Sequence, residues 1–323
     1  MIRIGIVGYG NVGKGAALAV NAASDMELKA VFTRRDIKSL RQEDGSLIHL
    51  SHVDSAASMI NDIDVMLLCG GSATDLPKQA PYFASMFNTV DSYDNHAKIP
   101  GYMAAIDAVA TKTTAIVSAG WDPGPFSMMR SLFESILPDG ATYTFWGKGV
   151  SQGHSDAIRR VEGVLHAIQY TIPIDSAVNA VRAGEKPVFE ARQKMRRECF
   201  VVADSNADKA KIEDTIKKMP HYFADYDTSV SFIEIEELNE KHSEMPHGGM
   251  VLRSGNTGEN TQVMEFSLNL ESNPEFTGSI MVAYARAAYR MAQEGLYGAK
   301  TVFDVPLSYL SDKDRLTLIK ELL

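Results

Sequence analysis

The sequence predicts an α/β protein with a doubly wound parallel sheet and a second, α+β domain with an open mixed sheet. Two patterns in the 323 residues support this class. Apolar runs of strand length alternate with helical patterns through residues 1–124, which is typical of a parallel sheet with helices on both faces. From residue 125 the strands become longer and are crossed by helices, which is typical of an α+β domain.

The first element is a strand that runs into a glycine turn. Ile4-Gly5-Ile6-Val7 leads to Gly8-x-Gly10-x-x-Gly13, and an alanine-rich helical segment follows at 16–23. In the Rossmann fold Gly8 would permit the turn, Gly10 would let phosphates approach the backbone, and Gly13 would let the helix pack on the strand. The helix N-terminus would meet the pyrophosphate charge. This context favours dinucleotide binding over a turn that merely packs closely.

Strands and helices then alternate through the rest of the first half. We expect strands at 27–32, 64–69, 89–92 and 114–118, and helices at 76–87 and 102–111. Ligands of such sheets bind at the carboxyl ends of the strands. The residues that follow each strand are therefore the candidates for the cofactor site.

The segment after the second strand, Thr33-Arg34-Arg35, indicates which dinucleotide binds. An NAD enzyme usually carries an acidic residue near this position for the ribose 2′-hydroxyl. Two guanidiniums can instead pair with a phosphate, which an acid would repel. The sequence therefore favours NADP over NAD. The alternative is a pair of solvated arginines, one of them neutralised by Asp36.

Small residues and aspartates follow the later strands. Cys69-Gly70-Gly71-Ser72 would let the backbone lie against a cofactor, and Thr74 or Asp75 is a candidate N-cap for the next helix. Asp94 and Asp122 follow two successive strands, at the edge where a nicotinamide should lie. Because loop aspartates are often turn formers or caps, a structural role stays open for both. No histidine lies near Cys69 in sequence, so we expect a small core residue and no nucleophile.

The second half is predicted to form one open, largely antiparallel or mixed sheet whose free face is a candidate dimer surface. We expect helices at 126–136, from 157 onward and at 207–219, and strands at 141–147, 167–172, 198–203, 229–235 and 262–270. A long helical pattern at 274–294 should return toward the first domain. The expected domains are 1–124 for dinucleotide binding, 125–272 for the α+β domain and 273–323 for the C-terminal helical segment.

Composition and charge exclude several function classes. The net charge of −9 argues against a nucleic-acid surface or an anionic membrane partner. No apolar run approaches membrane-spanning length. Two cysteines without a disulfide framework are typical of a reduced chain, so we expect a cytoplasmic protein. The histidines lack metal-ligand spacing, and we expect no metal site.

Seven longer motifs are more specific than the glycine turn. They are Leu68-Cys69-x-Gly-Ser-Ala-Thr-Asp75, Val90-Asp-x-Tyr-Asp-Asn-His96, Gly120-Trp-Asp-Pro-Gly124, Phe145-Trp-Gly147, Ser151-Gln-Gly-His-Ser-Asp156, Cys199-Phe-Val-Val-Ala-Asp204 and Met245-Pro-His-Gly-Gly249. Nearly end to end, the chain resembles the meso-diaminopimelate D-dehydrogenase family. The resemblance implies a Rossmann domain, a substrate-binding and dimerisation domain, a homodimer and NADP. It also implies reversible oxidative deamination of the D-centre of meso-2,6-diaminopimelate to L-2-amino-6-oxopimelate and ammonia, in lysine and cell-wall precursor synthesis.

The resemblance further implies a role for individual residues. Asp94 and Asp122 match the catalytic carboxylates near the D-centre. The residues that match the cofactor shell are Gly8, Tyr9, Gly10, Asn11, Val12, Gly13, Thr33, Arg34, Arg35, Cys69, Gly70, Gly71, Ser72, Ser92, Tyr93, Asp94, Gly120 and Trp121. The residues that match substrate contacts are Asp94, Trp121, Asp122, Trp146, Gln152, Gly153, Thr171, Arg197, His247 and Asn273. One departure is Gly70, where the family carries a bulkier residue.

The residue types suit a substrate with two ammonium and two carboxylate groups. Asp94 and Asp122 can accept from ammonium, while Arg197 can bind a carboxylate that His247 and Thr171 also reach. Two alternatives remain: a related D-amino-acid dehydrogenase with a relaxed site, and a non-catalytic NADP-binding regulator. A regulator would need neither the two aspartates nor the pair of Arg197 and His247, which disfavours it.

Overall fold

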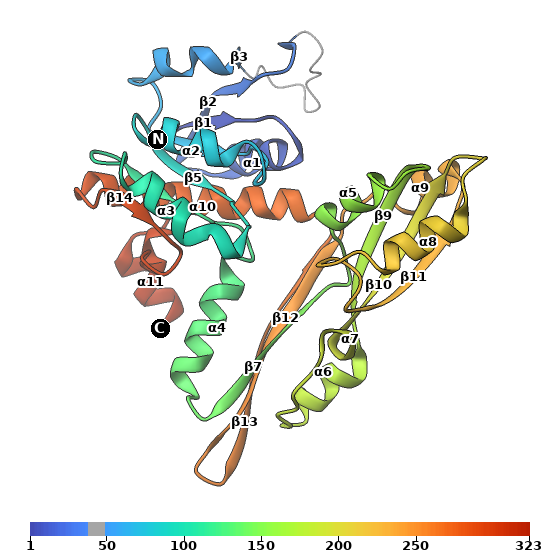
Figure 1. Ribbon diagram of the computed structural model, residues 1–323. Helices are drawn as coiled ribbons and strands as arrows, with labels where there is room; N and C mark the ends of the chain where they lie inside the picture. The colour runs from blue at the N-terminus through green and yellow to red at the C-terminus, as the bar shows by residue number, and fades with distance from the viewer. Residues whose placement is uncertain (38–48) are drawn as a thin grey trace. The chain divides into compact units, whose positions relative to one another are not determined.

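The computed structural model describes residues 1–37 and 49–323, which divide into two compact units. The first unit consists of Met1–Met128 together with Pro274–Leu323. The second unit is Met129–Asn273 and is continuous in sequence. Figure 1 shows the elements of both units along the chain.

The first unit contains a seven-stranded sheet in the order β3-β2-β1-β4-β5-β6-β14, and all neighbouring strands run parallel. The chain begins at β1 in the middle, proceeds outward to β3, and then returns to β4 beside β1. This is the doubly wound order, so the predicted fold class is confirmed. The strands are β1 (Ile2–Val7), β2 (Met26–Thr33), β3 (Leu50–His52), β4 (Val65–Leu68), β5 (Asn88–Asp91), β6 (Thr114–Ile116) and β14 (Gly298–Lys300).

Helices cover this sheet and bury its central strands. All four residues of β4 are buried, as a parallel strand covered on both faces requires. One apolar cluster joins Met66 of that strand to Phe83 and Ile106 on two of the helices. The helices of the first unit are α1 (Asn11–Ala22), η2 (Val53–Met59), α2 (Leu76–Ala84), η3 (His96–Lys98), α3 (Ile99–Asp107), α10 (Asn273–Gln293), η4 (Leu307–Tyr309) and α11 (Arg315–Leu322), whereas α4 (Pro125–Ile136) begins in the first unit and continues into the second.

An ion pair joins the two stretches of sequence that make up the first unit. The buried Arg286 of α10 donates to both carboxylate oxygens of Asp25, from Nε at 2.6 Å and from Nη2 at 2.7 Å. Its Nη1 donates to the carbonyl of Leu310 at 2.6 Å. The guanidinium holds the pKa of Asp25 below its usual value. Because Asp25 lies between α1 and β2, this pair connects the last helices to the start of the sheet.

The second unit has two sheets, although a single sheet was expected. One is four-stranded, in the order β11-β10-β9-β8, with β10 and β11 parallel and the other neighbours antiparallel. The other is antiparallel, in the order β13-β12-β7. The chain passes from one sheet to the other between β7 and β8, within two residues. The strands are β7 (Gly140–Trp146), β8 (Gly149–Val150), β9 (Val164–Pro173), β10 (Met195–Ala203), β11 (Asp227–Phe232), β12 (His247–Thr257) and β13 (Asn260–Leu270).

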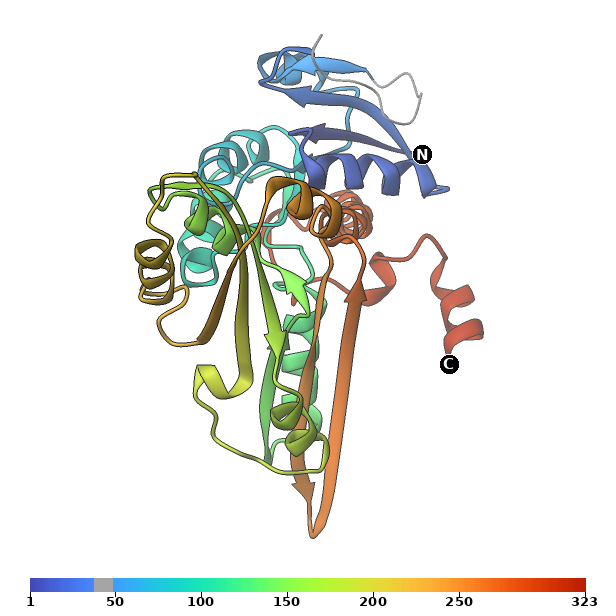
Figure 2. The same cartoon turned by 90° about the vertical axis from the view of Figure 1, so that its right-hand side faces the viewer.

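The strand β12 was not predicted. It pairs with β13 on one side and with β7 on the other, and Figure 2 shows β12 and β13 as one long hairpin. Its first three residues, His247-Gly248-Gly249, do not have the composition of a strand. Pairing on both sides therefore overrides the local preference.

The helix after β8 begins earlier than predicted. It was expected from residue 157 onward, but α5 spans Gln152–Arg159. Ser151 is its N-cap, and the hydroxyl accepts from the backbone N–H of His154 at 3.5 Å. The remaining helices of the unit are α6 (Asp175–Arg182), α7 (Ala191–Lys194), α8 (Lys209–Lys217) and α9 (Ile235–Lys241). Within residues 1–37 and 49–323, no helix is both long and apolar enough to span a membrane.

Candidate functional site

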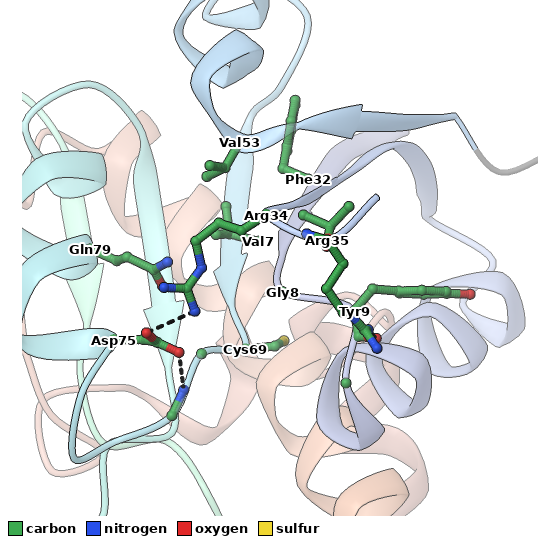
Figure 3. Close-up of a pocket in the computed structure, with 14 residues that line it drawn as sticks. Val7, Gly8, Tyr9, Phe32, Arg34, Arg35, Val53, Cys69, Asp75 and Gln79 are labelled. Atoms are coloured by element: carbon green, nitrogen blue, oxygen red, sulfur yellow. Dashed lines mark hydrogen bonds and ion pairs between the residues drawn. The ribbon is translucent and has the colours of Figure 1, made fainter. Parts of the chain in front are cut away.

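A pocket in the first unit lies at the carboxyl ends of β1, β2 and β4 (Figure 3). These strand ends meet where the two halves of the doubly wound sheet adjoin, which is the usual ligand position in this fold. Besides Val7, Phe32, Val53, Asp75 and Gln79, its lining consists of residues that the sequence placed in the cofactor shell. These are Gly8, Tyr9, Gly10, Thr33, Arg34, Arg35, Cys69, Gly70 and Gly71.

The glycine turn has the geometry that a pyrophosphate requires. Gly8 has φ +95°, which favours glycine, and its N–H donates to the carbonyl of Phe32 at 2.8 Å. A Cβ at Gly13 would lie 2.0 Å from the carbonyl oxygen of Gly8. Gly10 is the N-cap of α1 and supplies no side-chain cap. Asn11 and Val12 begin α1, whose first turn carries no acidic residue, as an anion site requires, although neither residue lines the pocket itself.

Two arginines lie beside this turn. Arg34 pairs with Asp75, with 2.9 Å between Nη2 and Oδ1 (Figure 3). Arg35 donates from its guanidinium to the carbonyl of Tyr9, and its backbone N–H donates to Thr33 Oγ1 at 3.1 Å. Both arginines are thus tethered at the rim of the pocket, although both remain exposed to solvent and the Arg34 side chain is 62% exposed.

The carboxylate of Asp75 is turned into the pocket. Asp75 occupies the N-cap position of α2 as anticipated, but its side chain makes no capping bond there. Its Oδ2 accepts instead from the N–H of Gly71 at 3.2 Å. Asp75 therefore fixes the loop after β4 and Arg34 together.

The absence of a side chain at Gly70 has a structural reason. A Cβ there would lie 2.6 Å from Oε1 of Gln79 and 2.8 Å from Cβ of Asp75. That Gln79 oxygen is buried and has no hydrogen-bond partner in the described part of the chain. A bulkier residue at 70 would thus require Gln79 to move.

Cys69 lines the same pocket as a neutral thiol. Burial raises its pKa to about 12, so the thiolate needed by a nucleophile is scarce at neutral pH. The expectation of a small packing residue agrees with this environment.

The carboxyl ends of β5 and β6 carry the next predicted residues. Asp94 is exposed and Asp122 is half-buried. Trp121 is buried and packs edge-to-face on Phe126, with 5.1 Å between ring centroids. Ser92 and Tyr93 follow β5 directly, whereas Gly120 precedes Trp121 after β6, and Ser72 belongs to the loop after β4.

One carboxylate at these strand ends was missed. Asp91, the last residue of β5, is 1% exposed and accepts three hydrogen bonds, from Tyr93, Tyr102 and Ser118. Burial raises its pKa to about 6. The sequence could have indicated a buried carboxylate here, because Asp91 is the last residue of an apolar strand.

The second unit holds Arg197 as a buried cation. It is 6% exposed and lies on β10 opposite Thr171 of β9, to whose hydroxyl its Nη1 donates. Its guanidinium stacks on the ring of Tyr226, 4.0 Å from the centroid. Nε has no partner, and no ion pair joins Arg197 to a carboxylate within residues 1–37 and 49–323. Burial accordingly lowers its pKa.

Two histidines near Arg197 are neutral. Burial and the charge of Arg197 lower the pKa of His154 to about 4, and the same two causes lower the pKa of His247. His247 Nδ1 accepts from the N–H of Gly248 at 2.7 Å. The positive charge of this group is therefore carried by Arg197. His154 was missed, because its burial against Tyr222 and Phe223 depends on the tertiary fold.

The other predicted substrate residues of the second unit surround the segment that leads to His247. Met245 accepts from Gln152 Nε2 at 3.0 Å through sulfur, and its carbonyl accepts from the N–H of Asn273 at 3.0 Å. Gly153 follows Gln152 at the start of α5, and a Cβ there would meet nothing within 4 Å. Trp146 ends β7, opposite Gly249 of β12.

Metal ligation has no support in the described ranges. Within residues 1–37 and 49–323, no group of three or more histidine, cysteine, aspartate or glutamate side chains could hold a metal ion.

Comparison with known proteins decides the family. Residues 120–272 match the family model of the diaminopimelic acid dehydrogenase C-terminal domain. The meso-diaminopimelate D-dehydrogenase of Ureibacillus thermosphaericus is 61% identical over 325 residues, covering 100% of this chain and 99% of that protein. The chain belongs to the meso-diaminopimelate D-dehydrogenase family. The family inferred from the seven motifs is therefore confirmed.

Two solved structures share the whole fold of this chain. A multiply substituted meso-diaminopimelate dehydrogenase from Clostridium tetani E88, solved with diaminopimelate, has a TM-score of 0.95 and 54% identity, with 100% of both chains covered. An engineered D-amino acid dehydrogenase bound to NADP⁺ has a TM-score of 0.88 and 40% identity, covering 100% of this chain and 99% of that one.

Proposed function

We propose that this protein is an NADP-dependent meso-diaminopimelate D-dehydrogenase. It catalyses the reversible oxidation of the D-centre of meso-2,6-diaminopimelate to L-2-amino-6-oxopimelate with release of ammonia. The reaction removes a hydride from Cα and a proton from the amine, after which water replaces nitrogen and ammonia leaves. The observation that carries the proposal is Arg197, a buried guanidinium with no carboxylate paired to it in the described chain. Such a cation needs an anionic ligand.

The residues of the first unit fit NADP. The turn from Gly8 to Gly13 holds the pyrophosphate at the start of α1, while Arg34 and Arg35 bind the 2′-phosphate. The pairing of Arg34 with Asp75 keeps the guanidinium at the pocket before the phosphate arrives. When bound, NADP supplies the nicotinamide ring that accepts the hydride.

The residues of the second unit bind the end of the substrate that does not react. Arg197 binds the distal carboxylate, since its Nε is unpaired and its Nη1 is oriented by Thr171. The neutral His247 offers a further polar group without adding charge. Gln152, Gly153 and Asn273 lie around the same segment at Met245 and complete this part of the site.

The reacting end is assigned to the two predicted aspartates. Asp94 and Asp122 accept hydrogen bonds from the ammonium of the D-centre, and Trp121 and Trp146 exclude water from it. Pinning the L-centre at Arg197 means that only a D-centre presents its Cα–H to the cofactor. Stereoselection therefore follows from binding both ends of one molecule.

We also propose a homodimer in the cytoplasm, with domains at 1–124, 125–272 and 273–323. The hairpin β12–β13 supports the dimer, because β13 is an edge strand with alternate residues exposed, including Val263. Both cysteines are free, which agrees with a reducing compartment. Light scattering coupled to gel filtration measures the mass directly, and a monomer at micromolar concentration would contradict the dimer.

The function is tested by following NADPH formation with different amino acids. We expect turnover of meso-diaminopimelate, with LL-diaminopimelate inactive because it has no D-centre. The DD-isomer should react poorly, since its distal centre has the wrong configuration for the site around Arg197. Comparable turnover of D-alanine or D-leucine would favour the relaxed D-amino-acid dehydrogenase. NADP binding without turnover of any amino acid would favour the regulator.

A further inference from the structure

We propose that Asp91 is a positioning residue, which holds the loops that carry Asp94 and Asp122 in one fixed arrangement. The inference rests on the proposed function, because it assigns these two aspartates to the reacting end. It concerns a buried side chain that is absent from the lining of the cofactor pocket. All groups involved belong to the first unit.

The two carboxylate oxygens of Asp91 have different partners. Oδ1 accepts from two backbone N–H groups, that of Tyr93 at 3.0 Å and that of Ser118 at 3.0 Å. Oδ2 accepts from the hydroxyl of Tyr102 at 2.8 Å. The backbone carbonyl of Asp91 also accepts from the N–H of Ala119 at 2.7 Å. One atom, Oδ1, therefore joins the loop after β5 to the loop after β6.

The loop after β6 adopts a strained conformation to reach this atom. Ser118 has φ +58°, a region that non-glycine residues seldom occupy. Its hydroxyl is buried without a hydrogen-bond partner in the described chain, so the side chain does not explain the conformation. The bond from its N–H to Asp91 does explain it, because strain of this kind persists where the surroundings impose it.

The constraint at Asp91 reaches both aspartates over a short, rigid path. Asp94 follows Tyr93, whose ring stacks on Tyr102 with 4.0 Å between centroids. Asp122 lies four residues after Ser118 and directly follows the buried Trp121. The N–H of Gly120 donates to the carbonyl of Pro123 at 2.9 Å, which closes that loop on itself. A shift at Oδ1 would thus displace both side chains together.

Two substitutions of Asp91 distinguish the hydrogen bonds that Oδ1 accepts from the negative charge of the carboxylate. In Asp91→Asn the amide oxygen can occupy the Oδ1 position and keep both backbone bonds. The amide nitrogen then donates to the hydroxyl of Tyr102, which can reverse its direction. In Asp91→Ala both backbone bonds are lost. Tyr102→Phe is the matched control, because it removes one bond to Asp91 and leaves the bonds to the loops intact.

The test measures the loops directly and the reaction separately. Hydrogen exchange of the free protein should accelerate in residues 92–96 and 118–124 for Asp91→Ala and stay near wild type for Asp91→Asn and Tyr102→Phe. We expect kcat to fall about 100-fold in Asp91→Ala, the scale of a displacement near 1 Å. The kinetic isotope effect on kcat with substrate deuterated at the D-centre should rise, since hydride transfer becomes slower. The Kd for NADP should change less than kcat, because the residues assigned to the pyrophosphate and the 2′-phosphate lie after β1 and β2 and keep their contacts, and only the cofactor contacts of the loops after β5 and β6 are loosened.

Several results would overturn the inference. One is a folded Asp91→Ala enzyme whose kcat lies within about threefold of the wild-type kcat, because the inference expects a fall of roughly 100-fold. Another is an Asp91→Asn enzyme that binds NADP normally and loses as much activity as the alanine variant. If Asp91→Ala does not fold, Asp91→Val combined with Tyr102→Phe removes the acceptor while filling the space, and the same exchange and kinetic results are required of it. Failure of the wild-type enzyme to oxidise meso-diaminopimelate would instead refute the proposed function.

Discussion

Replacing Arg197 by methionine should separate binding of the distal carboxylate from the stability of the protein. Methionine fills much of the space on β10 without a charge. Losing one partner of a buried, hydrogen-bonded charge pair typically costs about 2 to 5 kcal/mol. Taking about 3 kcal/mol, kcat/KM for meso-diaminopimelate should fall by roughly 100-fold, at about 1.4 kcal/mol for each factor of ten.

The free energy of unfolding of Arg197→Met should stay equal to that of the wild type or rise, although its kcat/KM falls. The guanidinium is 6% exposed, and its Nε has no partner in the described chain, so the folded protein carries its desolvation cost. Replacing a poorly compensated buried charge by an apolar side chain is often neutral or stabilising. Thermal unfolding of Arg197→Met should therefore occur at or above the wild-type temperature.

The structure supplies a matched control and the chemistry supplies a matched substrate. Arg196 is the exposed neighbour on β10 and pairs with Glu198, so Arg196→Met should leave kcat/KM almost unchanged. D-lysine is meso-diaminopimelate without the distal carboxylate. Its slow oxidation should be nearly insensitive to Arg197→Met. An equal loss on both substrates, or in both variants, would refute the assignment of Arg197.

Three further predictions concern the first unit. Replacing Arg34 and Arg35 together by glutamate should weaken NADP far more than NAD, measured by titration; equal losses would exclude a 2′-phosphate site. Because the pKa of Asp91 is about 6 in the folded protein and about 3.9 unfolded, its ionisation opposes folding, and about 3 kcal/mol of stability present below pH about 4 should be lost as the pH rises from about 4 to about 6. Asp91→Asn should abolish that contribution in urea unfolding, and an unchanged slope would place the titration elsewhere. Gly70→Ala should weaken NADP binding by crowding Gln79 Oε1, with Gln79→Ala restoring it; no rescue would mean that the crowding is not the cause.

Much of the first unit could be predicted because its pattern is local. The alternation of strands and helices, the glycine turn and the arginines after β2 are all visible in the sequence, and the strand order follows from the doubly wound class. The partner of Arg34 was not visible. Asp75 reaches it only because the loop after β4 returns to the same pocket.

The second unit was harder to predict because its elements depend on pairing between distant segments. The strand β12 begins with glycines and is stabilised by β7 and β13 on its two sides. Arg197 could have been placed more firmly from the residues alone. Strand alternation puts it on the same face as Met195 and Cys199, which are both buried, whereas Arg196 faces solvent. The pattern is hard to recognise because Arg197 belongs to a basic run, residues 192–197, which is more typical of a solvated surface.

The division of the first unit into two stretches of sequence has a consequence for its synthesis. Its edge strand β14 and its helix α10 are translated after the whole of the second unit. The bond between Arg286 and Asp25 joins residues that are 261 positions apart. The second unit, which is continuous, has all its contacts available before the ribosome finishes the chain. Synthesis of the first unit begins before that of the second unit and ends after it. Truncation near the C-terminus should therefore destabilise the unit that contains the N-terminus.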